Sequence, residues 1–253
     1  MMTEAGRYVG SVMDGKITGE GIMFYKNGDR YDGYWMEGAF HGKGKYVWAN
    51  GDSYTGSYKL SLKHGRGLHI RLIEKSKDPL GNGEWIYMYE GDYFEDMRHG
   101  HGTLKEQREA GDYEGPRFIE YTGEWEQDTF NGKGRLVVYE SKQRMIKFED
   151  HEGCFKYGVK DGLGRNIKLK DSEMYGDEEE FRREVLSSTN LDYQEFIGDF
   201  VNDRAVYHSG VLKNVKIPVD LVAMQNKQKT YQALGSSSSK PAVLQHKDDK
   251  LQS

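Results

Sequence analysis

Glycines and aromatic residues recur in this sequence on one template, and this repeat constrains the fold more than any other feature. In the clearest copy, Tyr31, Gly33 and Trp35 are followed by two further glycines, Gly42 and Gly44. Six copies keep this glycine spacing, and they begin at Tyr8, Tyr31, Tyr54, Tyr89, Tyr121 and His151. Because a sequence repeated at this length is one structural unit that stacks on its neighbours, the chain is expected to fold as an array.

The length of the repeat predicts one β-hairpin per copy. The first three copies begin 23 residues apart, at residues 8, 31 and 54, and two strands of about seven residues with two short turns fill that length. Residues 36–40 are the predicted turn within a copy, and Asn27-Gly28 and Asn50-Gly51 are predicted turns between copies, since Asn-Gly suits a tight hairpin. Later copies are longer, and their extra residues lie at 75–86, 107–119, 141–145 and 172–194.

The positions of the aromatic residues predict that one face of the sheet is a thin aromatic core. Tyr31, Gly33 and Trp35 are two residues apart, so they point to the same face of their strand. The predicted fold class is therefore all-β: an elongated, single-layer antiparallel β-meander of hairpin repeats. In the third copy Ile70 and Leu72 break this alternation, and the sequence gives no reason for it.

The end of the chain departs from the template. A degenerate seventh copy begins at Phe196, with Tyr207 and Ser209 where the glycine pair is expected. Short helices are predicted in an insertion, at 177–186, and near the C-terminus, where Pro218 begins an amphipathic stretch that ends at residue 234. The predicted organisation is a leader at 1–7, the array at 8–210, a terminal strand and helix at 211–234 and a flexible tail at 235–253.

The pattern Y-x-G-x-W-x-x-G-x-x-x-G-x-G, as in residues 31–44, resembles the MORN (membrane occupation and recognition nexus) repeat. The resemblance covers residues 8–173 well and 196–210 poorly. It implies an extended, twisted single-layer β-sheet. It also implies a role in scaffolding cytoskeletal or ciliary structures, in organising membrane contacts, or as the targeting region of an enzyme.

Composition excludes several other classes. The single cysteine, Cys154, excludes a disulfide within the chain and a multi-cysteine metal site. The sequence shows neither a signal peptide nor an apolar run of about 18 residues that would span a membrane, so a cytoplasmic location is expected. The net charge of -5 argues against nucleic acid as a partner.

Enzymatic motifs are absent from the sequence. Glycine pairs such as Gly19-x-Gly21 and Gly42-x-Gly44 lack the third glycine of a dinucleotide fingerprint, because Phe24 and Val47 stand at that position. No phosphate-binding loop, zinc-protease motif or nucleophile elbow is found. Some MORN arrays precede a lipid-kinase or methyltransferase domain, but the stretch after the sixth copy is too short for either. The prediction is a non-enzyme without a cofactor or a metal.

Two candidate binding features remain. The aromatic row is first of all the core of the sheet, and its ring edges are a candidate groove for a partner protein. The residues of this candidate groove are Tyr31, Trp35, Tyr54, Tyr58, Tyr89, Tyr93, Tyr121 and Trp125. Basic and imidazole side chains at equivalent positions near the turns are expected to line one edge of the ribbon as an anion stripe. The residues of this stripe are His41, Lys43, His64, Arg66, Arg98, His99, His101 and Lys133.

These features lead to two functional hypotheses. The first is a non-catalytic scaffold or adaptor that binds proteins of a cytoskeletal or ciliary (axonemal) complex. The second is a peripheral membrane adaptor that binds anionic phospholipid through the anion stripe. Acidic residues such as Glu37 and Asp128 flank the stripe, so its basic residues can also be plain polar turn residues.

Overall fold

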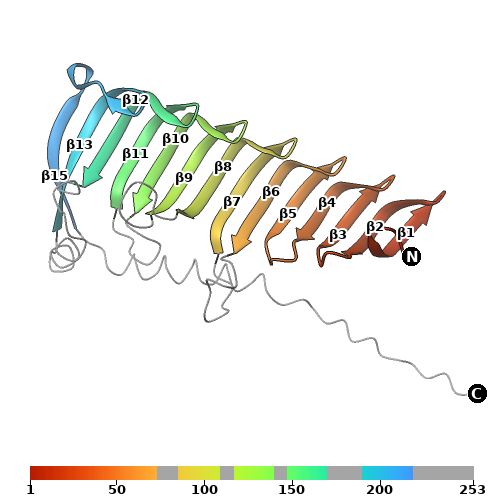
Figure 1. Cartoon of the computed structure of the whole chain (residues 1–253). Helices are drawn as coiled ribbons and strands as arrows, with labels where there is room; N and C mark the ends of the chain where they lie inside the picture. The colour runs from red at the N-terminus through yellow and green to blue at the C-terminus, as the bar shows by residue number, and fades with distance from the viewer. Residues whose placement is uncertain (73–84, 109–116, 140–146, 170–189, 219–253) are drawn as a thin grey trace, which may run out of the picture.

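The computed structural model describes residues 1–72, 85–108, 117–139, 147–169 and 190–218. These residues form one 15-stranded antiparallel sheet, in which the strands up to β14 are neighbours in chain order and β15 pairs with β13. The sheet is a single-layer ribbon with the N-terminus at one end and β13 and β15 at the other (Figure 1). The predicted fold class, an elongated single-layer β-meander, is confirmed.

Each of the first six copies contributes two strands. The strands of the first three copies are β1 (Gly6–Met13), β2 (Lys16–Tyr25), β3 (Arg30–Met36), β4 (Ala39–Val47), β5 (Ser53–Lys59) and β6 (Leu62–Leu72). Those of the next three are β7 (Trp85–Phe94), β8 (Met97–Arg108), β9 (Arg117–Glu126), β10 (Thr129–Tyr139), β11 (Lys147–Lys156) and β12 (Val159–Leu169). The last strands are β13 (Asn190–Val201), β14 (Arg204–Ala205) and β15 (Val211–Pro218).

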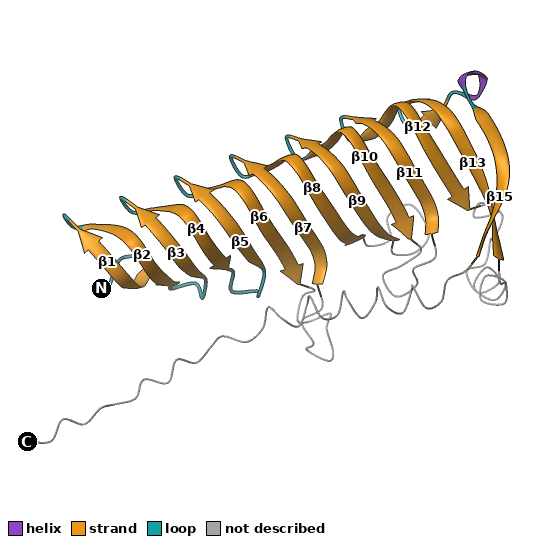
Figure 2. Cartoon of the chain, turned by 180° about the vertical axis from the view of Figure 1, so that it is seen from behind, coloured by secondary structure: helices purple, strands orange, loops and turns teal. Residues whose placement is uncertain are grey.

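The turns within the copies form a row along one edge of the ribbon (Figure 2). Both central residues of each turn have positive φ, for example Glu37 (50°) with Gly38 (87°), and Gln127 (48°) with Asp128 (66°). This is the geometry of a type I′ turn, whose twist matches that of the strands it joins. The second turn residue also donates its N–H to a carbonyl of the preceding copy, as Asp128 does to Arg98 at 3.1 Å. The turns therefore join neighbouring copies at this edge.

The seventh copy forms a hairpin whose return strand is interrupted. β14 and β15 both pair with β13, and a 3₁₀ turn at Tyr207–Ser209 separates them. Gly210 lies against Gly198 and the Phe196 ring, as Gly44 lies against Gly33 and the Tyr31 ring. The assignment of Ser209 to this glycine position was wrong, because the 3₁₀ turn adds one residue to the return strand.

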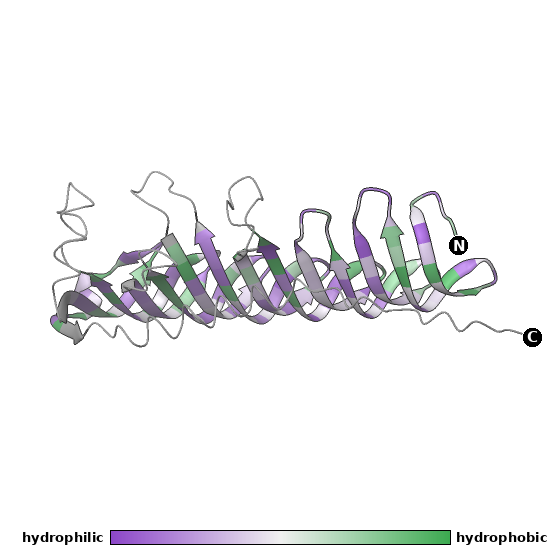
Figure 3. Cartoon of the chain, turned by 90° about the horizontal axis from the view of Figure 1, so that it is seen from below, coloured by the Kyte–Doolittle hydropathy of each residue, from purple (hydrophilic) through white to green (hydrophobic). Residues whose placement is uncertain are grey.

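The two faces of the sheet carry different buried clusters, and apolar and polar segments alternate along the strands (Figure 3). The repeat aromatic residues, Tyr31 among them, form the core of one face, which we call the tyrosine face. A second cluster contains Ile70, Met88, Phe118 and Val137. These residues neighbour tyrosine-face positions in sequence, so they point to the opposite face. Ile70 breaks the alternation of the third copy because its side chain is buried in the second cluster, on the opposite face.

The predicted helices at 177–186 and 218–234 lie outside the described residues, apart from Pro218, which ends β15. The 3₁₀ turn at Tyr207–Ser209 was not predicted. The part of the chain that the structure describes contains no helix with the length and hydropathy needed to cross a bilayer.

Candidate functional site: a groove on the tyrosine face

The repeat aromatic residues form one continuous ladder along the tyrosine face. From the second copy on, the second aromatic residue of a copy packs edge-on against the first ring of its own copy and of the copy before. Trp35 contacts Tyr31 at 5.0 Å and Tyr8 at 5.6 Å between ring centroids, with the rings nearly perpendicular. The same contacts recur up to Phe200, which lies between His151 and Phe196. Such edge-to-face pairs stabilise the array beyond the burial of the rings.

The glycines of the template make room for this ladder. A Cβ atom on Gly44 would lie 2.3 Å from the Tyr31 hydroxyl oxygen, so a larger residue clashes there. The Tyr31 hydroxyl donates to the carbonyl oxygen of Tyr34 at 3.0 Å, and the first tyrosines of four other copies do the same at 2.9–3.2 Å. The glycine–tyrosine pattern is therefore a packing requirement of this sheet.

All eight residues of the candidate aromatic groove are buried, with Tyr31, Tyr54, Tyr89 and Tyr121 at 0% exposure. Their ring bodies are the core of the tyrosine face. Two of the eight, Tyr93 and Trp125, also line a surface groove. The groove that a partner can reach is consequently built mainly from other residues.

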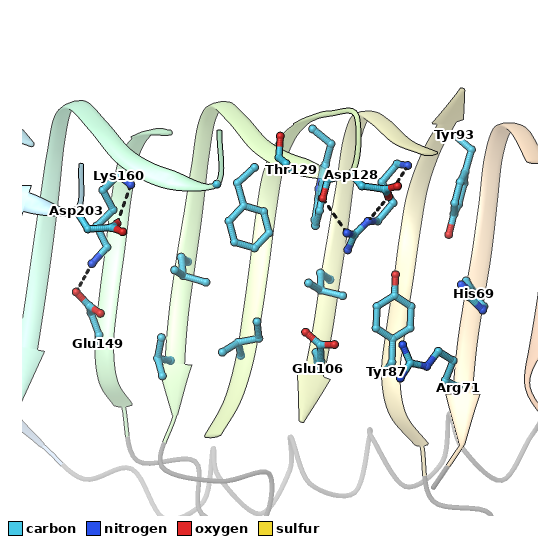
Figure 4. Close-up of a pocket in the computed structure, with 18 of the residues that line it drawn as sticks. His69, Arg71, Tyr87, Tyr93, Glu106, Asp128, Thr129, Glu149, Lys160 and Asp203 are labelled. Atoms are coloured by element: carbon cyan, nitrogen blue, oxygen red, sulfur yellow. Dashed lines mark hydrogen bonds and ion pairs between the residues drawn. The ribbon is translucent and has the colours of Figure 1, made fainter. Parts of the chain in front are cut away.

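This groove has a volume of about 1290 Å³ and runs across the tyrosine face from β6 to β12 (Figure 4). Its floor is apolar over β8, β9 and β10. The apolar side chains of the floor include Leu104, Ile119, Phe130, Leu136 and Val138. Charged residues lie on both sides of this floor, among them Lys63 and Arg71 on β6 and Lys160 on β12. An apolar floor with polar groups around it is the usual composition of a binding groove.

One position of the repeat supplies the basic side chains nearest the turn edge. In the second and fifth copies this position is Phe40 or Phe130, which stacks flat on the tyrosine at 3.9 and 3.8 Å. In the third, fourth and sixth copies it is basic: Lys63, Arg98 and Lys160. The Arg98 guanidinium lies 4.3 Å from the Trp125 ring centroid. The repeat thus presents either a ring or a cation at the same place.

An aspartate from the next turn holds each of these basic residues in position. Asp96, Asp128 and Asp203 accept the backbone N–H of Lys63, Arg98 and Lys160 at 2.8, 3.0 and 2.8 Å. Asp128 also accepts from the Arg98 Nε at 2.8 Å. Lys160 forms its ion pair with Glu149. Figure 4 shows these two groups of charges on either side of the apolar floor.

His69 lies at the centre of the basic end of the groove. Its ring contacts Trp48 at 5.5 Å and Tyr87 at 5.3 Å. Burial lowers the pKa of His69 to about 4, and the positive charges of Lys63, Arg71 and Arg98 add to this effect. The imidazole is therefore neutral at neutral pH.

The residues of the predicted anion stripe do not share one surface. Arg98 lies on the tyrosine face. Lys43 and Arg66 line a hollow on the opposite face together with Asp32 and Glu90. Lys133 lines a second hollow there, which also contains Glu152. His41 and His64 are half-buried near the turns, whereas His99 and His101 are exposed.

The sequence analysis missed the residues that give the groove its character: Lys63, His69, Arg71, Leu104, Ile119 and Leu136. Three of them could have been found by aligning the copies beyond the glycines. His69, Leu104 and Leu136 all stand 15 residues after the first aromatic residue of their copy, and that position faces the groove in each case.

The fold and the groove together define a repeat protein that is built from stacked β-hairpins and has a groove of about 1290 Å³ on its tyrosine face. The MORN repeat family matches the chain in six segments, at residues 8–30, 31–53, 54–70, 89–105, 121–137 and 151–165. The chain therefore contains six MORN repeats, and each match begins at a repeat start predicted from the sequence. A comparison with curated proteins finds no significant match.

MORN repeats are in general motifs for binding proteins or membrane lipids, and the repeat itself is non-catalytic. The described residues contain no group of three or more His, Cys, Asp or Glu side chains placed to hold a metal ion. What the arrangement offers chemically is a surface of apolar side chains, hydrogen-bond donors and fixed charges for a partner.

Proposed function

We propose that this chain is a non-catalytic scaffold or adaptor in the cytoplasm that binds other proteins of a cytoskeletal or ciliary (axonemal) assembly. The groove on the tyrosine face carries the proposal. Its apolar floor between two charged ends matches a protein interface, which has an apolar centre and a polar rim. The turn-to-turn hydrogen bonds and the continuous ring ladder suit the chain to hold partners along an elongated support.

The alternative is a membrane adaptor that uses the anion stripe. A lipid surface attracts a cluster of basic residues that face it together. Here the stripe is divided between two faces, and carboxylates accompany its lysines and arginines in both hollows of the opposite face. This distribution favours a protein as the partner.

The test places a charge in the groove of the full chain. Leu136→Glu adds a carboxylate to the apolar floor, and Thr122→Glu on the exposed opposite face is the matched control. We expect proteins that co-purify with the chain from ciliated cells to be lost with Leu136→Glu and retained with Thr122→Glu. Circular dichroism checks that both variants are folded. Equal retention by both variants would contradict the proposal.

The membrane alternative is tested with liposomes at about 0.15 M salt, where surface charges act over about 8 Å. We expect the chain to stay in solution with both neutral and anionic liposomes. Co-sedimentation with anionic liposomes that is lost in a triple variant, Lys43→Glu, Arg66→Glu and Lys133→Glu, would favour the membrane adaptor instead.

A further inference from the structure

The basic end of the groove collects hydrogen-bond donors that have no acceptor. The Tyr93 side chain is 4% exposed, and its hydroxyl has no hydrogen-bond partner among the described residues. In Figure 4 this hydroxyl points into the groove toward His69. A buried hydroxyl without a partner loses its bonds to water and gains nothing in return. An acceptor brought by a ligand would satisfy it.

Lys63 places a positive charge beside that hydroxyl. Its ammonium lies 5.7 Å from the Tyr93 ring centroid and 5.6 Å from that of Tyr54. Asp96 accepts the backbone N–H of Lys63, not its ammonium. Within the described part of the chain, the Lys63 ammonium forms no ion pair. Burial lowers the pKa of Lys63, and the nearby carboxylates of Asp96 and Asp128 offset only part of this effect, so a carboxylate brought by a ligand would stabilise its charged form.

Arg71 and Arg98 place two further positive charges near His69. The Arg71 guanidinium lies 5.1 Å from the Tyr87 ring centroid and has no ion-pair partner in the described ranges. Arg98 is already bonded to Asp128, which fixes its orientation. The charges of Lys63, Arg71 and Arg98 all reach His69 strongly enough to lower its pKa. These groups therefore surround one position in the groove, and all of them donate.

We propose that this position binds a carboxylate side chain of the partner protein, so that the segment held in the groove carries an Asp or Glu over His69. This inference rests on the proposed function, because it names the chemistry by which the groove recognises its partner. The Tyr93 hydroxyl and the Lys63 ammonium donate to the carboxylate. Bonds between a charged donor and a charged acceptor are about twice as strong as neutral ones.

The surroundings favour a carboxylate over a phosphate group. Asp96, Glu106 and Asp128 line the same end of the groove as Lys63, Arg71 and Arg98. Their repulsion grows with the charge of the ligand, so it acts more strongly against a doubly charged phosphate than against a singly charged carboxylate. Next to the donors lies the apolar floor of Leu104, Ile119 and Leu136, which suits the apolar side chains of a polypeptide. A free phosphate or a lipid headgroup leaves that floor uncovered.

The spacing of the strands also defines the form of the segment. Neighbouring strands lie about 4.8 Å apart, and one turn of an α-helix rises about 5.4 Å. A helix lying across the strands thus presents about one side chain per strand. With its acidic residue at β6 and β7, it reaches Leu104 on β8, Ile119 on β9 and Leu136 on β10 with apolar residues roughly 4, 8 and 11 positions away.

The experiment selects peptides from a random 16-residue display library on the immobilised full chain and measures synthetic peptides by fluorescence polarisation. We expect an Asp or Glu at one end of an apolar face. Replacing that residue by Asn or Gln should weaken binding about tenfold. Lys63→Met and Tyr93→Phe should remove the difference between the acidic and the amide peptide, whereas Lys133→Met on the opposite face should preserve it.

Tyr93→Phe is the most informative variant, because it removes a hydroxyl that has no partner in the free protein. It should maintain or raise the thermal stability, because the hydroxyl that it removes is unsatisfied in the free protein, and it should weaken the binding of the acidic peptide. If Leu136→Glu abolishes peptide binding but the acidic and amide peptides bind equally well, this inference is overturned. The proposed function still stands in that case. Peptides insensitive to Leu136→Glu would overturn both. A phosphoserine peptide that binds tenfold more tightly than the Glu peptide would show that the position takes phosphate, which also overturns the inference.

Discussion

His151 is the one position of the aromatic ladder where a tyrosine should improve the protein. Its side chain is 0% exposed and packs between Phe155 at 5.2 Å and Phe200 at 4.8 Å. Neither ring nitrogen has a hydrogen bond of good geometry among the described residues, although the side chain of Asn166 on the facing strand lies close enough to favour the protonated ring. Gly153 and Gly164 flank the ring just as glycines flank the tyrosines of other copies. The His151→Tyr side chain therefore has room in the existing ladder.

The expected gain at neutral pH follows from two hydrogen-bond effects. The new hydroxyl would donate to the Cys154 carbonyl, as the equivalent tyrosines do three residues on at 2.9–3.2 Å, which contributes about 1 kcal/mol. Removing the unpaired ring nitrogens contributes about 1 kcal/mol more. A gain of about 2 kcal/mol in the free energy of unfolding corresponds to a rise in Tm of roughly 4 to 8 °C for a chain of this size.

The same substitution should change how stability depends on pH. Burial lowers the pKa of His151 to about 4, and the charge of Lys160 adds to this, whereas the unfolded chain has a pKa near 6.5. Between these values the unfolded state binds one proton more than the folded state, so stability rises with pH. Above pH 6.5, His151 therefore does not change the free energy of unfolding. As the pH falls to 4, it lowers the free energy of unfolding by about 3 kcal/mol. His151→Tyr removes this loss.

The assay is thermal unfolding of the full chain at pH 7 and at pH 5, with His99→Tyr as the control for removing one exposed histidine. We expect the advantage of His151→Tyr over the native chain to be larger at pH 5, by about 2 kcal/mol. A variant that melts below the native chain at pH 7, or that keeps the native dependence on pH, would refute the reasoning.

Two further predictions concern the repeat framework. Gly44→Ala places its Cβ 2.3 Å from the hydroxyl oxygen of fully buried Tyr31, so we expect urea unfolding to show a loss of about 2–3 kcal/mol; an effect no larger than that of Thr55→Ala on the opposite face would contradict the packing argument. Asp128→Ala removes the acceptor of two Arg98 hydrogen bonds and a residue suited to positive φ, so a loss of about 1–2 kcal/mol is expected. Asp128→Asn keeps one acceptor and should cost less, and equal losses would argue against this account.

The fold could be predicted because single residues of the repeat determine how its strands pair. Only glycine fits where Gly44 and its equivalents lie against the tyrosine ring, so the spacing of the glycines reveals the register of the strands. The same reasoning failed at Gly210, since an unforeseen 3₁₀ turn lengthens the last return strand by one residue. A template of fixed spacing cannot detect such an addition.

The binding surface was harder to predict, because the stripe was grouped by its nearness to the turns and not by the face of each strand. The pairing of β7 with β8 shifts register between Gly91 and Asp92, and Gly100 adopts a φ of 58° in the facing strand. The shift adds two residues to β8, because Gly91 pairs with Gly102 and Asp92 with His99, so the alternation of faces beyond it is unchanged. Arg98 stands nine residues after the first aromatic residue of its copy, whereas Lys133 stands twelve residues after that of its own copy. An odd and an even offset lie on opposite faces, so a stripe grouped by its nearness to the turns is divided between two faces.

The repeat separates the residues that hold the sheet from those that give it specificity. The first aromatic residue and its two glycines pack closely against each other, and a tyrosine stands there in five copies, with His151 and Phe196 in the other two. By contrast, the position of Phe40 is only half-buried, and it accepts a phenylalanine, a lysine or an arginine over the tyrosine ring. Charge can therefore vary from copy to copy along the groove while the ladder beneath stays constant. Each array of this kind therefore has its own sequence of apolar and basic positions along the groove. A partner is recognised when its side chains complement these positions along the length of the sheet.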